Sequence, residues 1–188
     1  MKKIITLFLI PMIALSLVGA SYALWSKTIT LDGTVQTGIV DKKIVSVFCS
    51  DTGIDPGYTK DVASCTAEIG IGGDSASFIL DNTYPSYNID VTFKEKNVGT
   101  IPVKINDVLL TLSGPGGTVS IICMGLPCDL VTPEMEVHYD DNFGVQIDPG
   151  VTVANSVNMH VRQGAVQGSS YALTVKERAV QWNEYPAP

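Results

Sequence analysis

Short runs of alternating apolar and polar residues recur along most of the chain and predict β-strands. The first runs from Trp25 to Gln36, where odd positions are mainly apolar and even positions are polar. Because a strand turns successive side chains to opposite faces, this stretch is expected to be half-buried. Further strands are predicted over residues 39–48, 65–71, 75–80, 87–93, 101–105, 118–123, 151–161 and 171–182. Residues 163–169 fit no element.

The number and spacing of these runs predict the fold class. Past the first strand, no stretch has the 3.6-residue period of a helix, so the chain is expected to be all-β. About nine or ten short strands separated by turns are typical of a β-sandwich or jelly roll. We therefore predict one jelly-roll β-sandwich domain with a protruding N-terminal strand.

Turn residues between the runs predict how strands connect. The turn at 97–100 (Asn-Val-Gly-Thr) predicts a hairpin between residues 87–93 and 101–105, with one buried face. Leu109 and Leu110 break the alternation and predict a bulge before the glycine-rich turn at 114–117.

The first 23 residues have the pattern of a secretory signal peptide. Lys2 and Lys3 precede an apolar run, and the small residues Ser21 and Ala23 form a small-x-small cleavage site. Cleavage after Ala23 would leave the first strand at the extreme N-terminus, free to pair with another molecule. A retained transmembrane helix is the alternative, since a span needs about 20 apolar residues. Pro11 within the run and the cleavage site favour the signal peptide.

Charge restricts the partners of the chain. The formal net charge is −7 at pH 7, and removal of residues 1–23 would take away two lysines and no acid. Nucleic acids and anionic membranes attract clustered Lys and Arg, and no basic run occurs outside the leader. We therefore expect a secreted, extracellular or cell-surface protein without a nucleic-acid partner and without stable membrane association after the signal is removed.

Four cysteines in an exported chain predict disulfides. Proximity in the sequence favours Cys49 with Cys65 and Cys123 with Cys128, although two other pairings are possible. A zinc site is a less favoured alternative, because no CxxC spacing occurs and neither histidine lies close in sequence to a cysteine.

Candidate chemistry is sparse. Glu134, Glu136, His138 and Asp140 are predicted to share one face of a short strand and could hold a metal, but a solvated outer face explains the same pattern and is preferred. Residues 140–142 (Asp-Asp-Asn) could contribute to a structural calcium site, although a turn needs no ion. The chain has no HExxH, GxSxG or glycine-rich phosphate motif. We therefore expect no enzyme activity, no catalytic residue, no small-molecule substrate and no required cofactor.

Five short stretches, in order along nearly the whole mature chain, carry a family resemblance. They are 23–28 (Ala-Leu-Trp-Ser-Lys-Thr), 33–38 (Gly-Thr-Val-Gln-Thr-Gly), 84–87 (Tyr-Pro-Ser-Tyr), 97–104 (Asn-Val-Gly-Thr-Ile-Pro-Val-Lys) and 181–183 (Gln-Trp-Asn). Together they resemble the TasA and camelysin group of exported proteins, above all the archaeal members that build bundling pili and cannula-like filaments. The resemblance implies a jelly-roll subunit that polymerises by donor-strand complementation, in which the N-terminal strand of one subunit fills a groove in the next.

The resemblance places the donor strand at the mature N-terminus. The side chains expected at the subunit interface are Leu24, Trp25, Ile29, Leu31 and Val35. Strand addition takes backbone hydrogen bonds from a sheet edge and fits alternate side chains into pockets, which an unpaired amphipathic strand can supply. We thus expect a signal peptide over 1–23, a donor strand over 24–38 and a jelly-roll domain over 39–188, with copies of the same chain as partners in a homopolymer.

Two other functions remain open. A monomeric cell-surface binding module would fold the first strand back into its own sheet. Some relatives in the resembled group are described as metalloproteases, so a secreted metalloprotease is a further alternative. This chain lacks the zinc-protease motif, which disfavours that activity.

Overall fold

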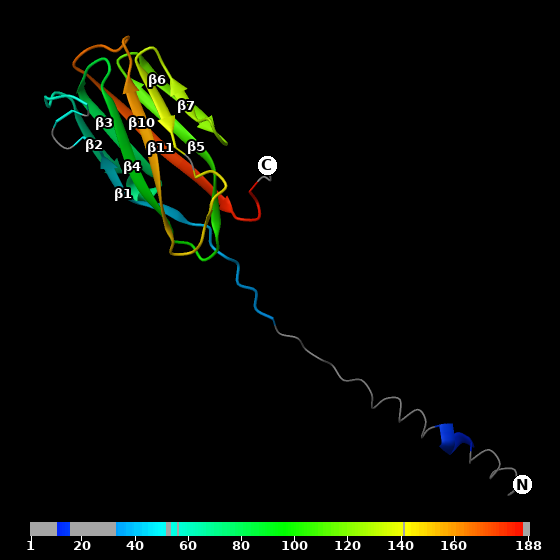
Figure 1. Ribbon diagram of the computed structural model, residues 1–188. Coiled ribbons are helices and arrows are strands. Elements are labelled where there is room, and N and C mark those ends of the chain that lie inside the picture. Colours follow the sequence, from blue (N-terminus) through cyan, green and yellow to red (C-terminus); the bar gives the residue numbers. More distant parts are fainter. Residues whose placement is uncertain (1–10, 16–32, 52–53, 56, 141, 186–188) are drawn as a thin grey trace, which may run out of the picture. The chain divides into compact units, whose positions relative to one another are not determined.

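The computed structural model describes residues 11–15, 33–51, 54–55, 57–140 and 142–185 (Figure 1). The chain divides into two compact units, Met1–Gln36 and Thr37–Pro188. Residues 11–15 are helical, and among the described residues no helix is long and apolar enough to cross a membrane.

Within the described residues, eleven strands form two antiparallel sheets that pack face to face (Figure 1). The first sheet has the order β1-β4-β10-β8-β7, and the second has the order β2-β3-β11-β5-β6, with β9 beside β5. The strands are β1 (Lys42–Cys49), β2 (Ser64–Ile69), β3 (Ser75–Thr83), β4 (Asn88–Asn97), β5 (Val103–Gly114), β6 (Gly117–Cys123), β7 (Asp129–Val131), β8 (Met135–Tyr139), β9 (Gln146–Ile147), β10 (Thr152–Val161) and β11 (Ser169–Gln181). The all-β sandwich is confirmed, whereas jelly-roll connectivity stays a prediction.

The core lies between the sheets because each strand turns every second side chain inward. In β4 these are Ile89, Val91 and Phe93, all buried, while the residues between them face outward. Phe93 meets Phe78 of β3 across the interface, with 6.5 Å between the ring centroids. Burial of each such side chain contributes about 1.5–3 kcal/mol.

The predicted hairpin across residues 97–100 is wrong. β4 pairs with β1 and β10, whereas β5 pairs with β11 and β6, so this loop crosses from one sheet to the other. Asn97 stabilises the crossing, because its Nδ2 donates to the carbonyl oxygens of Ile101 and Ile147, at 2.8 Å each. Alternation shows that a strand has one buried face. It does not show whether the next strand in the chain lies beside it in the same sheet or in the opposite sheet, because both arrangements give the same pattern.

The predicted bulge in β5 exists at a different position. The register between β5 and β11 shifts at Asn106, the extra residue between Ile105 and Asp107. Leu109 and Leu110 lie within a regular stretch of this register, and only the second of them is buried. The glycine-rich turn after β5 is as predicted, since β5 pairs with β6 up to residue 114 opposite residue 117.

The shortest strands carry no alternation that could reveal them. β7 has three residues and β9 has two, fewer than one full repeat of a recognisable pattern. Both lie on the sheets only because longer neighbours, β8 and β5, supply hydrogen bonds to them.

Candidate functional site

Most of the expected donor strand lies outside the described residues. Leu24, Trp25, Ile29 and Leu31 belong to this undescribed part, so their pairing stays a prediction. Val35 is described: it is 91% exposed and lies in no strand.

The segment that follows is attached to the sandwich. The backbone N–H of Ile39 donates to Thr100 Oγ1 at 2.9 Å, and the backbone N–H of Thr100 donates to the Ile39 carbonyl at 3.0 Å. A Cβ added to Gly99 would lie 2.3 Å from that same carbonyl oxygen, so this close approach requires glycine. The chain therefore enters the sandwich at the crossing between β4 and β5.

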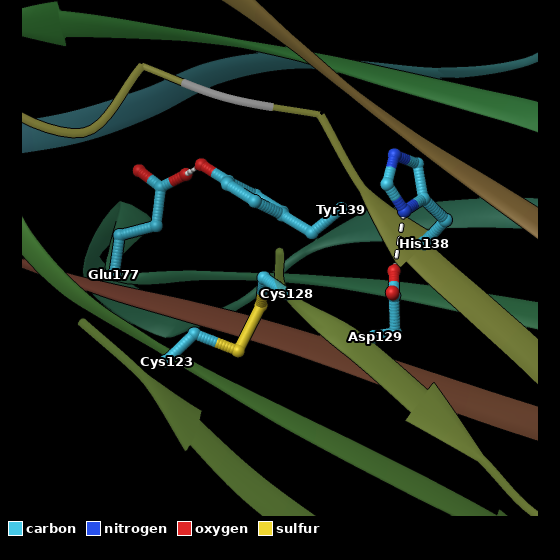
Figure 2. Close-up of a disulfide and its surroundings, with 6 residues drawn as sticks. All are labelled: Cys123, Cys128, Asp129, His138, Tyr139 and Glu177. Carbon is cyan, nitrogen blue, oxygen red and sulfur yellow. Dashed lines mark hydrogen bonds and ion pairs between the residues drawn. A yellow bond between two sulfur atoms is a disulfide. The ribbon is translucent and has the colours of Figure 1, made fainter. Parts of the chain in front are cut away.

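Two disulfides close the two open sides of the sandwich. Cys49 of β1 is joined to Cys65 of β2, and Cys123 of β6 is joined to Cys128, directly before β7 (Figure 2). These are the pairings that sequence proximity favours. The first bond joins the edge strands β1 and β2 of the two sheets, and the second joins edge strand β6 to the residue directly before edge strand β7. Since none of the four cysteines is free, the zinc alternative is wrong.

The predicted polar face of residues 134–140 is the solvated outer face of β8. Glu136 and His138 are exposed there, and His138 Nδ1 pairs with Asp129 of neighbouring β7 (Figure 2). Among the described residues no group of three His, Cys, Asp or Glu side chains could hold a metal ion. Calcium binding by residues 140–142 stays a prediction, because residue 141 is not described.

A cluster of charged and polar side chains lies inside the sandwich. Lys42 of β1, Glu95 of β4 and Asn155 of β10 come from the first sheet, and Glu177 of β11 comes from the second. Both carboxylate side chains are completely buried, and the lysine side chain is 6% exposed. Lys42 Nζ contacts both carboxylates and lies 2.5 Å from Glu177 Oε2. The alternation hides this cluster, because its members occupy inward positions in otherwise apolar series.

Every carboxylate oxygen in the cluster has a hydrogen-bond partner. Asn155 Nδ2 donates to Glu95 Oε1 at 3.1 Å and to Glu177 Oε1 at 3.0 Å. The Tyr139 hydroxyl donates to the same Glu177 oxygen at 2.5 Å (Figure 2). The amide oxygen of Asn155 accepts a hydrogen bond from Asn142 Nδ2. Buried polar groups are tolerated when satisfied in this way.

The surroundings shift the pKa values of the two carboxyl groups in opposite directions. Burial, together with the adjacent Glu177 carboxylate, raises the pKa of Glu95 to about 8. Burial also pushes the pKa of Glu177 upward, but hydrogen bonding with Glu95 and the charge of Lys42 outweigh it and lower that pKa. Burial alone would lower the pKa of Lys42, yet the two carboxyl groups raise it. At neutral pH the cluster thus holds one proton on Glu95, one negative and one positive charge.

An apolar groove lies on the open side between β6 and β7. Val119, which is 46% exposed, lines this groove from β6, an edge strand with one row of unpaired backbone groups. The groove has a volume of about 370 Å³. Its lining is mainly apolar, with Leu112, Val119, Val131, Pro133 and Tyr171, but it also includes Thr132 and Glu134. This edge of the second sheet could receive another strand.

A second hollow lies beside the loop closed by Cys49 and Cys65. Buried Asp55 orders this loop, because its carboxylate accepts hydrogen bonds from the backbone of Val62 and Ala63 and from the Tyr84 hydroxyl, the last at 2.7 Å. The Tyr84 ring makes an edge contact with Tyr58, with 5.6 Å between centroids. A pocket of about 430 Å³ is lined by both rings and by polar side chains. Aromatic and polar groups together suit a small polar ligand.

Comparison with known proteins does not assign this chain to a family. No family model, no curated protein and no solved structure matches this chain. Its fold and sites define a β-sandwich with a disulfide across each open side and an ionic cluster in its core. Its function must be inferred from these features.

Proposed function

We propose that this protein is the structural subunit of an extracellular filament, in which residues 24–35 of one subunit add as a strand to the next subunit. The observation that carries the proposal is the apolar edge of β6 with its groove toward β7. That edge is the acceptor. A head-to-tail contact of this kind gives an open filament when its rotation does not close a ring.

The energetics require both side chains and backbone. Burial of Trp25, Ile29, Leu31 and Val35 would contribute about 1.5–3 kcal/mol each. Ordering each residue of the arm costs about 1–2 kcal/mol, so side-chain burial alone does not suffice. Hydrogen bonds with the edge of β6 at about 1 kcal/mol each supply part of the difference. An exposed, unpaired edge is thus a necessary part of the interface.

Export is part of the proposal. The signal-like leader supports secretion, and the two disulfides are compatible with an oxidising, extracellular environment. Removal of residues 1–23 would free the donor strand. An intact mass that begins at Leu24 supports this step, whereas a retained leader would contradict it.

The test of assembly introduces a charge on each side of the contact. Ile29→Asp would bury an unpaired carboxylate in the groove, so filaments should be absent in electron micrographs of the exported protein. Thr28→Asp is the matched control, because position 28 is on the opposite face of the predicted strand and should permit filaments. Filament formation by a protein that lacks residues 24–35 would refute the proposal.

On the acceptor side, Val119→Asp places a charge in the groove, which Val119 lines from β6. It should abolish filaments, while Ile71→Asp, at a fully exposed position outside that groove, should leave them intact. If Val119→Asp still assembles and Ile29→Asp does not, the donor strand binds elsewhere than β6.

A monomeric binding module is the second candidate, and the pocket beside Tyr58 and Tyr84 favours it. In that case, wild-type protein would elute as a monomer in size-exclusion chromatography at all concentrations. Ile29→Asp would then lower the stability of the monomer itself, since the strand would belong to its own sheet.

A further inference from the structure

The buried cluster places an amine and a carboxamide on the same two carboxyl groups. Lys42 Nζ contacts one oxygen of each carboxyl group, and Asn155 Nδ2 contacts the other oxygen of each. The lysine and asparagine belong to β1 and β10, which both pair with β4. Two reactive groups are thus held together by strands that cannot separate without unfolding.

We propose that Lys42 and Asn155 form a self-modification site, in which the lysine Nζ becomes linked to the asparagine Cγ by an amide bond, with Glu95 and Glu177 transferring the protons. The product is a covalent cross-link between β1 and β10. It forms once per molecule and requires only this domain, so it does not depend on the proposed filament function.

The reaction balances without any other reactant. The bond between Lys42 Nζ and Asn155 Cγ forms, and the bond between Cγ and Nδ2 breaks. Of the three protons on the lysine ammonium, one passes to Glu177, one reaches Nδ2 through the carboxyl groups, and one stays on the new amide. Nδ2 leaves as ammonia. No oxidant, reductant or cofactor takes part.

Glu177 can generate the nucleophile. The lysine must lose a proton before it attacks, and Glu177 Oε2 lies 2.5 Å from Nζ. The transfer converts an ion pair into two neutral groups, and burial disfavours the charged form of each. The ion pair is the resting state, so the neutral amine is the minor, reactive form.

Glu95 is the acid for the leaving group. Its Oε1 lies 3.1 Å from Asn155 Nδ2, the atom that has to gain a proton. Because burial and Glu177 raise the pKa of Glu95 to about 8, its carboxyl group keeps a proton at neutral pH. Two carboxyl groups with different protonation states thus provide a base and an acid in one site.

The surroundings activate the carboxamide and exclude water. Asn142 Nδ2 donates to the amide oxygen of Asn155, where negative charge develops as the amine attacks. Asn155 is only 4% exposed and lies opposite buried Phe93 in the β10–β4 register, so little water reaches its carboxamide. Groups fixed in this way react with effective molarities of about 10⁵–10⁸ M, and hydrolysis does not compete where water is excluded.

Asn155 is a better acceptor than either carboxyl group. Amide formation with Glu95 or Glu177 would release water instead of ammonia. The ionised carboxylate of Glu177 resists attack because it already holds negative charge, and the proton of Glu95 is needed on the leaving group. The asparagine carbonyl carries no charge and receives a hydrogen bond. This difference in the leaving group makes the assignment testable by mass.

The test is the intact mass of the folded, exported protein with both disulfides intact. We expect a mass lower than the sequence mass by one ammonia, after the hydrogens lost to the disulfides are counted, and a branched peptide that joins Lys42 to Asn155 in a proteolytic digest. The full mass in folded protein would overturn the proposal. Loss of water, or ammonia lost from any other residue, would overturn it as well.

Variants test the proton transfers. In Glu95→Gln, which keeps the size of the side chain, cross-linking should slow by about 10²–10⁴-fold, the usual contribution of general acid–base catalysis. Lys43→Ala, at the exposed neighbouring position, should cross-link as wild type does. Circular dichroism and the disulfide mass confirm that each variant is folded. A folded Glu95→Gln protein that cross-links at the wild-type rate would refute the acid–base assignment.

Discussion

The interior of the sandwich contains two regions that share the same strands and differ in what stabilises them. In the apolar region, inward positions carry side chains such as Phe78, Leu80 and Leu173, whose burial is favourable without a partner. In the ionic region, inward positions a few residues away carry Glu95 and Glu177, whose burial is unfavourable unless other groups compensate for lost water. The same strand geometry therefore has opposite energetic consequences.

This difference shows where the stability of the fold depends on single side chains. In the apolar region, each side chain contributes roughly in proportion to its own area. In the ionic region, the value of each member depends on all the others, and apolar replacement of a whole buried ion cluster is often neutral or stabilising. Stability alone therefore does not explain why a protein keeps such a cluster, which is consistent with a chemical role.

The largest effect is expected for Lys42→Met. Compared with protein whose Lys42 and Asn155 are not joined, it leaves the ionised Glu177 buried without a counter-charge, which should lower the free energy of unfolding by about 3–5 kcal/mol. The variant also lacks the amine needed for the cross-link. Lys43→Met, at the exposed next position, should change this free energy by less than about 0.5 kcal/mol. Urea denaturation of both variants measures the difference, and equal effects would show that the ionic region does not need its lysine.

In the apolar region, Leu80→Ala should lower the free energy of unfolding by about 3 kcal/mol, because it removes buried surface and leaves a cavity. The matched control is Ile79→Ala on the outward side of β3, where the side chain is only half-buried. We expect a clearly smaller loss in the control. Urea denaturation again provides the measurement, and an equal loss at both positions would contradict the assignment of inward and outward faces.

The pH dependence of stability should report Glu95 in protein whose Lys42 and Asn155 are not joined. The pKa of Glu95 rises from 4.5 to about 8 on folding, so between these values the folded state holds a proton that the unfolded chain releases. Stability should be greatest near the lower value and fall as the pH rises, by at most about 1.4 kcal/mol per pH unit. Below that range, the lowered pKa of Glu177 has the opposite sign, and stability should fall again.

Denaturation measured from pH 5 to pH 8 tests this dependence. Glu95→Gln cannot titrate and should remove the decline between these values. A decline that persists unchanged in the variant would assign the titration to another group.

The smallest effect is expected for an ion pair outside the core. His138 and Asp129 pair on the outer face, where their side chains are 49% and 40% exposed. Water screens such a pair, so Asp129→Asn should change the free energy of unfolding by at most about 1 kcal/mol. Thermal denaturation at pH 6 provides the measurement. A loss as large as that of Lys42→Met would show that burial is not what distinguishes the two charged groups.

The positions of the strands could be predicted because alternation is a local property. The long strands β4, β10 and β11 lie where the runs 87–93, 151–161 and 171–182 predict them. Their partners could not be predicted, as the crossing at residues 97–100 shows, because a buried face does not specify which strand lies beside it. The broken alternation at Leu109 and Leu110 predicts a bulge there, whereas the extra residue is the polar Asn106.

The sequence contains a signal of the ionic cluster, namely polar residues at inward positions, but alternation alone does not show what these residues contact. Glu95 continues the inward series after Phe93, Glu177 continues the one after Val175, and Asn155 interrupts the apolar series of β10. A polar residue in an inward position predicts a buried polar group. It does not predict the identity of its partners.

The sequence by itself determined the all-β class, the inward face of each long strand and the proximity that favours the two disulfides, because these depend on neighbouring residues. Only the tertiary structure decided that Lys42, Glu95, Asn155 and Glu177 meet, since the pairing of strands depends on burial over the whole domain. These residues are far apart in the chain, and each side chain alone would be unfavourable in the core. Their contact exists because β1, β4 and β10 lie side by side in one sheet and β11 faces them from the other.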